Sequence, residues 1–309
     1  MAVSKASGAV SEKSINWTGL IHLFVVYIVW GSTYLAIRVA VRPGAGFPPF
    51  WLGALRLLAA SLLLGAWAVI SRQRLKPSRK DVIVLVASGL LLWLGGNGLL
   101  NWAEQRVDSG LAALIIGATP IWVALMEALL DRKLPSPLLA GSLLIGFSGI
   151  ALLTAPTLFS GVQANIFSIL VVLFAALSWG GGTLLQSRRP IDMPPATSSA
   201  YQQFIGGISQ LAVALLISEP RPTPTASAWL AWVYLVIFGS VLAFTSFIQA
   251  VKLLPINIVM TYPFVNPVIA VLLGRVILSE PLTWWTVAGA GLTLLGVAGV
   301  FRSRYRRRT

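Results

Sequence analysis

Cysteine is absent from this 309-residue sequence, and histidine occurs once, as His22. Disulfides, thiolate metal sites and cysteine nucleophiles are therefore excluded, and zinc sites and catalytic triads lose their main supplier of ligands and bases. Charged residues make up only 10% of the chain, against roughly 25% in an ordinary soluble domain. This composition argues against a soluble globule, a disordered chain and most classes of enzyme.

Apolar residues dominate what is present. They account for 57% of the chain, accompanied by 12 Trp, 28 Gly and 18 Pro, a combination typical of helical membrane proteins. A transmembrane helix needs about 20 mainly apolar residues. Ten stretches qualify: 17–41, 49–70, 81–102, 109–131, 136–155, 163–186, 196–218, 228–250, 256–278 and 283–301. Prolines punctuate the linkers, as helix breakers should. The sequence therefore predicts an all-α integral membrane protein with ten transmembrane helices.

The basic residues predict the orientation of these spans. A net charge of +14 would suggest nucleic-acid binding in a soluble protein, but the spans exclude such a partner and make the lipid bilayer the surroundings. If the N-terminus is cytoplasmic, the two tails and the inner linkers hold 17 of the 23 Lys and Arg. The positive-inside rule thus favours two cytoplasmic termini, with residues 1–16 as a leader and 302–309 as a basic tail. The first span is expected to be retained and not cleaved.

The two halves of the chain resemble each other. At an offset of 149 residues, Trp30-Gly31 matches Trp179-Gly180, and at 147 residues Pro120 matches Pro267. Two stripes of small residues also correspond: Ser142, Gly146, Gly149 and Gly289, Thr293, Gly296. These matches predict two five-span repeats, 17–155 and 163–301. Because five is odd, the second repeat enters the membrane from the other side, which is the inverted architecture of secondary transporters with a site near the midplane.

Several motifs make the chain resemble a known family. They are Trp30-Gly31-Ser32-Thr33, Arg56 at the start of the second span, Thr119-Pro120, Asn266-Pro267 and Leu278-Ser279-Glu280-Pro281. With them the chain resembles the drug/metabolite transporter superfamily, specifically its ten-helix EamA-type members, and within these a bacterial aromatic amino-acid exporter. The resemblance implies export across the bacterial inner membrane by alternating access around a central cavity. It also implies a cavity lined mainly by spans one, three, four, six, eight and nine.

Polar and aromatic residues in the middle of spans are the candidates for substrate binding, because polar groups in lipid tend to face neighbouring helices or a wet cavity. The predicted binding residues are Trp30, Thr33, Asn97, Asn101, Trp102, Thr119, Trp179, Tyr262 and Asn266. Trp30 and Trp179 would form a paired aromatic wall. The alternatives are hydrogen bonds between spans, worth roughly 0.6 to 2 kcal/mol each, and close helix packing of the two indoles beside glycines.

Prolines and arginines are the candidates for gating. Pro120, Pro263 and Pro267 interrupt spans and serve either as hinges or as static kinks. Arg38 and Arg56 lie toward the outer ends of their spans, near Glu104, Arg106 and Asp108. The expected arrangement is an ion-pair cluster that closes the outer mouth. The alternative is that Arg38 or Arg56 binds a substrate carboxylate directly.

The resulting functional hypothesis is export of small amphipathic metabolites, above all aromatic and other hydrophobic amino acids. A multidrug or cationic-toxin exporter of the same superfamily is the alternative, and a channel is a further one. A membrane-embedded enzyme is disfavoured because no nucleophile with a base and no metal set lies at membrane depth. No cofactor is expected, since no GxxxxGK[ST] loop occurs. The small-residue stripes indicate either packing inside one repeat, which is favoured, or a weak homodimer of an otherwise monomeric chain.

Overall fold

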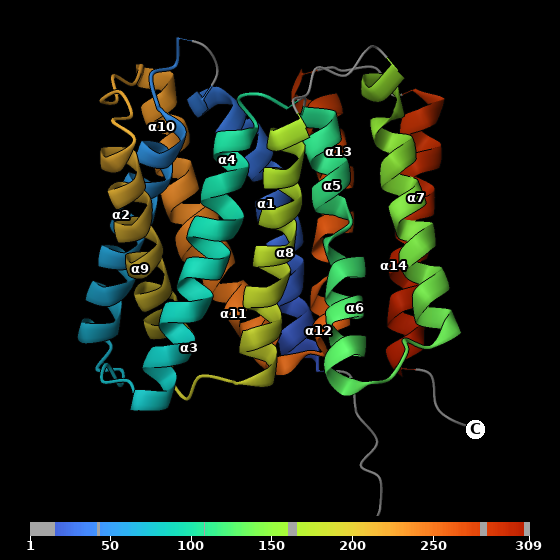
Figure 1. Cartoon of the computed structure of the whole chain (residues 1–309), viewed down its shortest axis with the longest axis horizontal. Coiled ribbons are helices and arrows are strands. Elements are labelled where there is room, and N and C mark those ends of the chain that lie inside the picture. Colours follow the sequence, from blue (N-terminus) through green and yellow to red (C-terminus); the bar gives the residue numbers. More distant parts are fainter. Residues whose placement is uncertain (1–15, 42–43, 108, 160–165, 279–282, 306–309) are drawn as a thin grey trace, which may run out of the picture.

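The computed structural model describes residues 16–41, 44–107, 109–159, 166–278 and 283–305, and in this part of the chain all regular structure is helical (Figure 1). The elements of the first half are α1 (Trp17–Val41), α2 (Pro49–Ile70), α3 (Arg79–Gly89), η1 (Leu90–Gly98), α4 (Leu99–Ala103), α5 (Ser109–Gly117), α6 (Thr119–Asp131) and α7 (Pro137–Phe159). Those of the second half are α8 (Ile166–Arg188), α9 (Pro195–Leu216), α10 (Ala226–Tyr234), η2 (Leu235–Ala243), α11 (Phe244–Leu253), α12 (Ile256–Val259), α13 (Tyr262–Leu278) and α14 (Trp284–Tyr305).

Local sequence signals begin several of these helices. Pro49, Pro137 and Pro195 each occupy the first helical position, where the missing N–H has no intrahelical partner to lose. A capping box starts α3: Ser78 Oγ accepts from the backbone N–H of Asp81 at 3.1 Å, and the Asp81 carboxylate accepts from the N–H of Ser78 at 3.1 Å. The helix starts are thus largely encoded in residues next to them.

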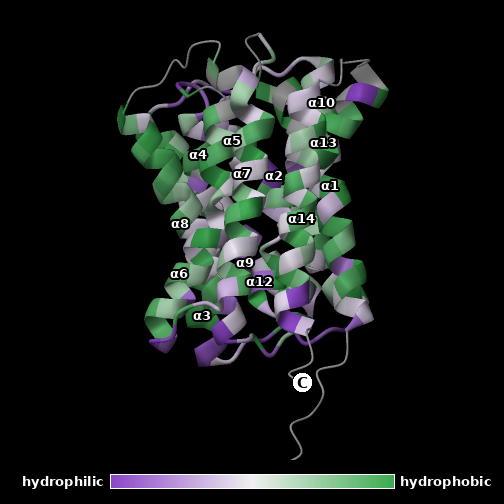
Figure 2. Ribbon diagram, turned by 90° about the vertical axis from the view of Figure 1, so that its right-hand side faces the viewer, coloured by the Kyte–Doolittle hydropathy of each residue, from purple (hydrophilic) through white to green (hydrophobic). Residues whose placement is uncertain are grey.

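Nine helices of the described chain are long and apolar enough to cross a membrane, with mean hydropathy between 1.5 and 2.0 in their apolar windows. Figure 2 shows hydrophobic residues over the sides of the bundle and hydrophilic ones gathered mainly at its ends. The chain is therefore an all-helical membrane protein, as the sequence predicts. The helix outside this set is α9, whose 22 residues include the fully buried Gln202, Gln203 and Gln210. The predicted count of ten spans stays a prediction.

Two spans carry a wide, π-helical stretch in the middle. In such a stretch the hydrogen-bond pattern shifts, and backbone carbonyls become available to other partners. On η1, the carbonyls of Leu91 and Trp93 accept from Ser178 Oγ and Gln210 Nε2, both at 2.7 Å. On η2, those of Gly239 and Ser240 accept from Trp30 Nε1 at 3.0 Å and Gln203 Nε2 at 3.1 Å. Side chains of distant helices therefore hold both stretches in place.

The two stripes of small residues pack against each other. Helices α7 and α14 lie side by side at one edge of the bundle (Figure 1). A Cβ on Gly149 would lie 2.4 Å from the Thr293 nitrogen, and one on Gly296 would lie 2.4 Å from the Gly146 nitrogen. Only glycine allows this approach of the two backbones. The stripes therefore pack within one chain, but the expectation that they pack inside a single repeat is wrong, because α7 and α14 belong to different predicted repeats.

Prolines mark two breaks inside spans. Helix α5 ends at Gly117, and α6 restarts at Thr119-Pro120; α12 ends at Val259, and α13 restarts at Tyr262-Pro263. Pro267 lies within α13 without ending it. The predicted interruptions are present at Pro120 and Pro263. Their use as hinges stays a prediction.

Candidate functional site

A cavity of about 570 Å³ lies inside the bundle. We call the end of the bundle where α1 begins and α14 finishes the terminal end. On α1 the lining residues run from Trp30, in the middle, to Val41, the last residue of the helix. Glu104, directly after α4, also lines the cavity. The cavity therefore extends from the middle of the bundle to the end opposite the terminal end.

Eight of the nine predicted binding residues line this one cavity. They come from α1, η1, α4, α6, α8 and α13, and are Trp30, Thr33, Asn97, Asn101, Thr119, Trp179, Tyr262 and Asn266. Trp102 is the exception. Its ring packs on Phe167 with 6.2 Å between centroids, and the Arg106 guanidinium carbon lies 4.5 Å from its centroid. The structure thus collects side chains that are up to 236 positions apart, Trp30 and Asn266 being the extremes.

Aromatic rings form the inner part of the lining. Trp30 meets Trp179 edge to face at 5.7 Å between ring centroids, and meets Tyr262 at 5.0 Å. Trp93 lies 5.7 Å from Trp179, and Phe247 lies 5.2 Å from Trp30. Edge-to-face contacts of this kind add about 0.5 to 1.5 kcal/mol per pair beyond burial. The two predicted indoles therefore pack on one another and also present surface to the cavity.

The polar lining residues differ in whether their hydrogen-bonding atoms already have a partner in the protein. Thr33 and Thr119 donate to carbonyls one turn back on their own chain, Trp30 O at 2.7 Å and Ile116 O at 2.5 Å. Asn101 Nδ2 donates to Asn97 Oδ1 at a long 3.4 Å. Asn266 is 2% exposed, and its Oδ1 has no hydrogen-bond partner in the described structure. An unpaired buried polar group costs about 1 to 3 kcal/mol, so Asn266 is a ready partner for a ligand or water.

Arg56 reaches the cavity from α2. It is 5% exposed, its Nε donates to Ser240 Oγ at 2.7 Å, and its guanidinium carbon lies 5.9 Å from the Trp93 ring centroid. Among the described residues, neither Arg56 nor Arg106 pairs with a carboxylate, and Glu104 pairs with no cation. The expected ion-pair cluster is therefore absent from the described side chains, because Ser240 and Trp93 surround the Arg56 guanidinium. Asp108 and the side chain of Arg38 lie outside the described residues.

Glu104 and Trp93 extend the predicted set. Burial raises the pKa of Glu104 to about 7, since the charged carboxylate is poorly hydrated at the edge of the cavity. Trp93 lines the cavity and is 1% exposed. The sequence contained a signal for it, namely a tryptophan in the middle of a span, which is the same signal that singled out Trp30 and Trp179. No cluster of His, Cys, Asp or Glu suited to a metal ion occurs among the residues that the structure describes.

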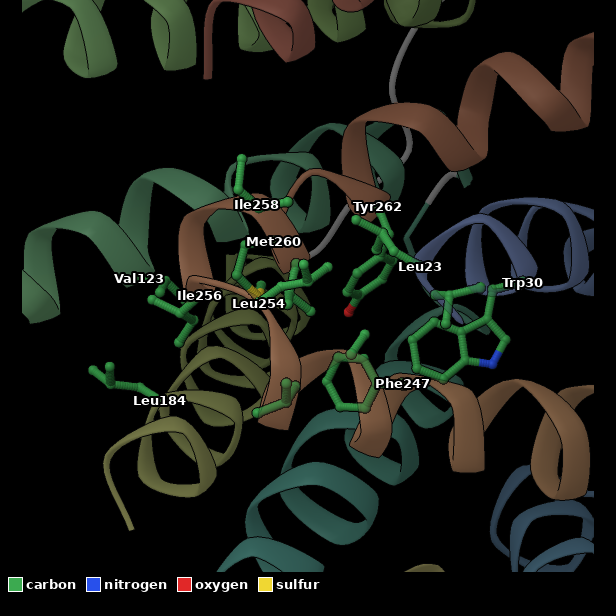
Figure 3. Close-up of a cluster of buried hydrophobic side chains, with 14 of the residues drawn as sticks. Leu23, Trp30, Val123, Leu184, Phe247, Leu254, Ile256, Ile258, Met260 and Tyr262 are labelled. Carbon is green, nitrogen blue, oxygen red and sulfur yellow. The ribbon is translucent and has the colours of Figure 1, made fainter. Parts of the chain in front are cut away.

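A layer of buried apolar side chains lies between Trp30 and the terminal end, and Figure 3 shows several of its members. Its members are at most 5% exposed and include Leu23, Phe247, Leu254, Ile256, Ile258 and Met260. Tyr27 reinforces the layer, since its hydroxyl lies 2.5 Å from Thr261 Oγ1. No lining residue of the cavity on α1 precedes Trp30, so on this helix the cavity stops short of Leu23.

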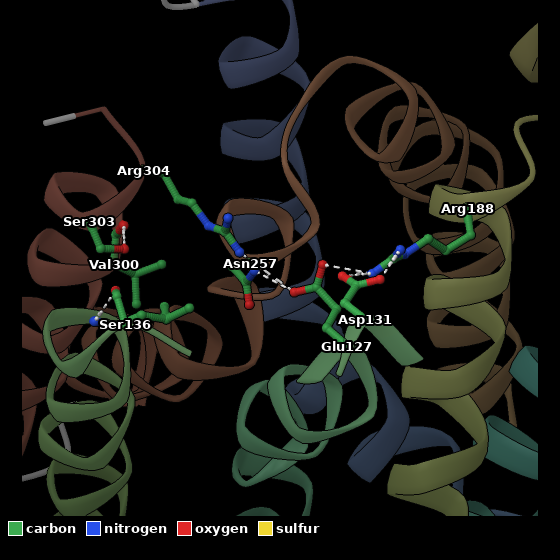
Figure 4. Close-up of polar contacts among 9 residues, drawn as sticks. Glu127, Asp131, Ser136, Arg188, Asn257, Val300, Ser303 and Arg304 are labelled. Carbon is green, nitrogen blue, oxygen red and sulfur yellow. Dashed lines mark hydrogen bonds and ion pairs between the residues drawn. The ribbon is translucent and has the colours of Figure 1, made fainter. Parts of the chain in front are cut away.

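An ion-pair network lies beyond that layer (Figure 4). Arg188 donates to both carboxylate oxygens of Asp131 at 2.6 Å and lies 3.6 Å from Glu127. Glu127 also lies 3.6 Å from Arg304 and accepts from Asn257 Nδ2 at 2.6 Å. We call these five residues the terminal network. It joins α6, α8, α12 and α14 at the terminal end.

Comparison of the sequence with known protein families assigns the chain to one of them. The model of the EamA-like transporter family matches residues 17–155 and 166–302. The chain belongs to this family, within the drug/metabolite transporter superfamily. Membership makes it a membrane transporter and not an enzyme. The sequence resemblance to EamA-type members is thereby confirmed.

Individual relatives cover nearly all of the chain. The uncharacterized inner membrane transporter YedA of Escherichia coli K12 is 31% identical, over 92% of this chain and 90% of its own length. A chloroplastic WAT1-related protein of Arabidopsis thaliana is 27% identical, over 92% of this chain and 68% of its own. A solved crystal structure with 21% identity superposes with a TM-score of 0.78, covering 95% of this chain and all of that one, and so shares the fold.

Proposed function

We propose that this EamA-family transporter exports small amphipathic metabolites, above all aromatic and other hydrophobic amino acids, by alternating access. The observation that carries the proposal is the cavity itself. Its volume of about 570 Å³ lies in the range of roughly 300 to 1,000 Å³ typical of small-molecule sites. Aromatic rings line its inner part, and Asn266 and Trp179 contribute buried polar atoms that have no hydrogen-bond partner among the described residues. An amino acid with an aromatic side chain offers matching groups for both.

The proposed architecture is ten spans in two inverted repeats, 17–155 and 163–301. Two features support it: the family model matches two stretches of similar length, and π-helical stretches occur in both halves at η1 and η2. With α9 counted as a span, an even number brings both termini to the same side. The basic residues favour the cytoplasm for that side. The printed name of the Escherichia coli relative favours the bacterial inner membrane.

Under this topology the cavity would open outward, and the terminal end would be the closed cytoplasmic end. Trp30, Thr33, Asn97, Asn101, Thr119, Trp179, Tyr262 and Asn266 are the proposed binding residues. Trp102 becomes a neighbour of the site. Export then requires the apolar layer and the terminal network to separate while the opposite end closes, and the breaks before Pro120 and Pro263 offer places where the spans can bend.

A multidrug or cationic-toxin exporter is the second candidate. Glu104 favours it, since a carboxylate in a cavity that also holds aromatic rings suits an organic cation. The Arg56 guanidinium, which lines the same cavity, opposes it.

Counterflow in liposomes tests the proposal. Purified protein is reconstituted, and exchange of labelled phenylalanine is measured with unlabelled amino acids or organic dications as competitors. We expect saturable exchange that aromatic amino acids inhibit, and a large loss of it in Trp179→Ala and Asn266→Ala. Arg79→Gln, which removes an exposed charge at the start of α3, serves as the control. Exchange inhibited only by dications would establish the second candidate, and absence of any exchange would sink both.

A further inference from the structure

Arg56 is a buried cation that has no ion-pair partner among the described residues. It is the eighth residue of α2, so its Cα lies about 10 Å along the helix from the start, at a rise of 1.5 Å per residue. It is 5% exposed, and no described carboxylate pairs with it. Leaving a buried charge uncompensated is strongly unfavourable, and ionisable residues inside spans usually mark a pathway or a ligand.

The guanidinium is fixed in one orientation. Its Nε donates to Ser240 Oγ at 2.7 Å. Its other side lies against Gly239, where an added Cβ would come within 3.0 Å of Nη2. Both contacts come from η2, whose wide turn is itself held by Trp30 and Gln203. The guanidinium therefore lies against a wall whose backbone carbonyls are themselves hydrogen-bonded to Trp30 and Gln203.

The two terminal nitrogens of the guanidinium, Nη1 and Nη2, have no protein acceptor in the described structure. Arginine has five N–H donors, and in the described structure only Nε has a protein acceptor. Arg56 lines the same cavity as Asn266 and the indoles of Trp30 and Trp179. A planar pair of N–H groups matches the two oxygens of a carboxylate, which lysine or an amide cannot match as well.

We propose that Arg56 is the specificity-determining residue that binds the carboxylate of the substrate. The inference rests on the proposed function and deepens it: the substrates are carboxylate-bearing amphipaths, and organic cations that lack a carboxylate are rejected. The carboxylate supplies an ion-pair partner that no described side chain provides. The apolar part of the substrate then lies against the aromatic rings at the inner end of the cavity.

Matched ligands test this assignment on the unaltered protein. Phenylalanine and phenylalaninamide share the ring and the ammonium group and differ at the carboxylate; 2-phenylethylamine lacks that group altogether. We expect phenylalaninamide and 2-phenylethylamine to compete at least about 30-fold more weakly than phenylalanine, because truncating one member of a buried charge pair has effects of this size. Ligand-induced thermal stabilisation of the purified protein measures the same preference for phenylalanine over the two analogues, without transport.

Variants show whether Arg56 causes the preference for a substrate with a carboxylate. In Arg56→Gln the preference for phenylalanine over its amide should fall toward unity, and Arg56→Lys should keep part of it. Ser240→Ala, which frees the guanidinium without removing it, should reduce the ratio by a smaller factor. Arg79→Gln should leave the ratio unchanged. If Arg56→Gln does not fold, the ligand series on the unaltered chain and the Ser240→Ala ratio decide.

The outcomes separate the two proposals. Phenylalanine exchange with equal competition by its amide would overturn the role of Arg56 and leave the proposed function standing. A strong preference that persists unchanged in Arg56→Gln would do the same. Exchange and thermal stabilisation that only organic cations produce, or that no member of the series produces, would overturn both.

Discussion

Glu104 is the residue whose charge state the fold alters most clearly outside the spans. Burial raises its pKa from the ordinary value of 4.5 to about 7. A carboxyl with a raised folded-state pKa holds its proton more tightly in the folded than in the unfolded chain. Its stabilising contribution is therefore present at low pH and is lost as the pH rises from about 4.5 to about 7.

We predict that Glu104→Gln flattens this pH dependence. Thermal unfolding in detergent, followed from about pH 5 to about pH 8, should show the parent losing stability relative to the variant across this window. Comparing the two proteins cancels the pH-dependent contributions of the titratable groups that they share. Parallel pH profiles would mean that Glu104 is hydrated as in an unfolded chain.

Glu219 acts as a cap on a helix that it does not belong to. Its carboxylate accepts from the backbone N–H groups of Phe50 at 3.2 Å and Trp51 at 2.9 Å, at the start of α2. These N–H groups have no intrahelical acceptor, and the positive helix end favours an anion. We predict that Glu219→Ala lowers the unfolding free energy by about 1 kcal/mol and Glu219→Gln by less. Chemical unfolding in detergent measures this, and an unchanged unfolding free energy in Glu219→Gln would refute the role of the charge.

At the scale of elements, the contact of α7 with α14 depends on the absence of side chains. Gly296 faces the backbone of α7, whereas a Cβ at Gly291, on the same helix, meets nothing within 4 Å. We predict that Gly296→Ala destabilises the protein by about 1 to 3 kcal/mol, because the backbones must separate. Gly291→Ala is the matched control and should be neutral or slightly stabilising. Thermal unfolding of the two variants checks this, and similar melting temperatures would contradict the packing.

At the scale of the molecule, the terminal network and the apolar layer close one end of the bundle. Arg188 and Asp131 are partly exposed, with side-chain exposures of 38% and 42%, so each ion pair contributes modestly. We predict that Arg188→Gln shifts the population toward conformations with this end open by a factor of about two to five.

The absence of native cysteine makes this shift measurable. Ile258→Cys places a single thiol in the buried layer, where the native side chain is fully buried (Figure 3). Maleimide labelling of this thiol should be about two- to fivefold faster when Arg188→Gln is added. The neighbouring Arg189→Gln is the control and should not change the rate. Equal rates in all three proteins would show that the network does not hold the closed state.

The sequence was sufficient for those properties that depend on neighbouring residues. Long apolar runs determined that the chain lies in a membrane. Asn266 and Trp179 stood out as site candidates because a polar side chain in mid-span is costly and a tryptophan there is unusual. The prolines at 120 and 263 likewise marked breaks that the structure contains. Helix starts followed from caps within a few residues of each end.

Only the tertiary structure decided which of these groups meet. The sequence could not show that Arg56 has no ion-pair partner among the described residues, that Trp93 joins the lining, or that Trp102 does not. Nor could it show that the stripe around Gly149 packs on the other half of the chain. Hydropathy and capping are local properties, whereas the neighbours of a side chain in mid-span are set by how helices from distant parts of the chain rotate and pack. Membrane embedding was thus determined by the sequence alone, and the site by packing.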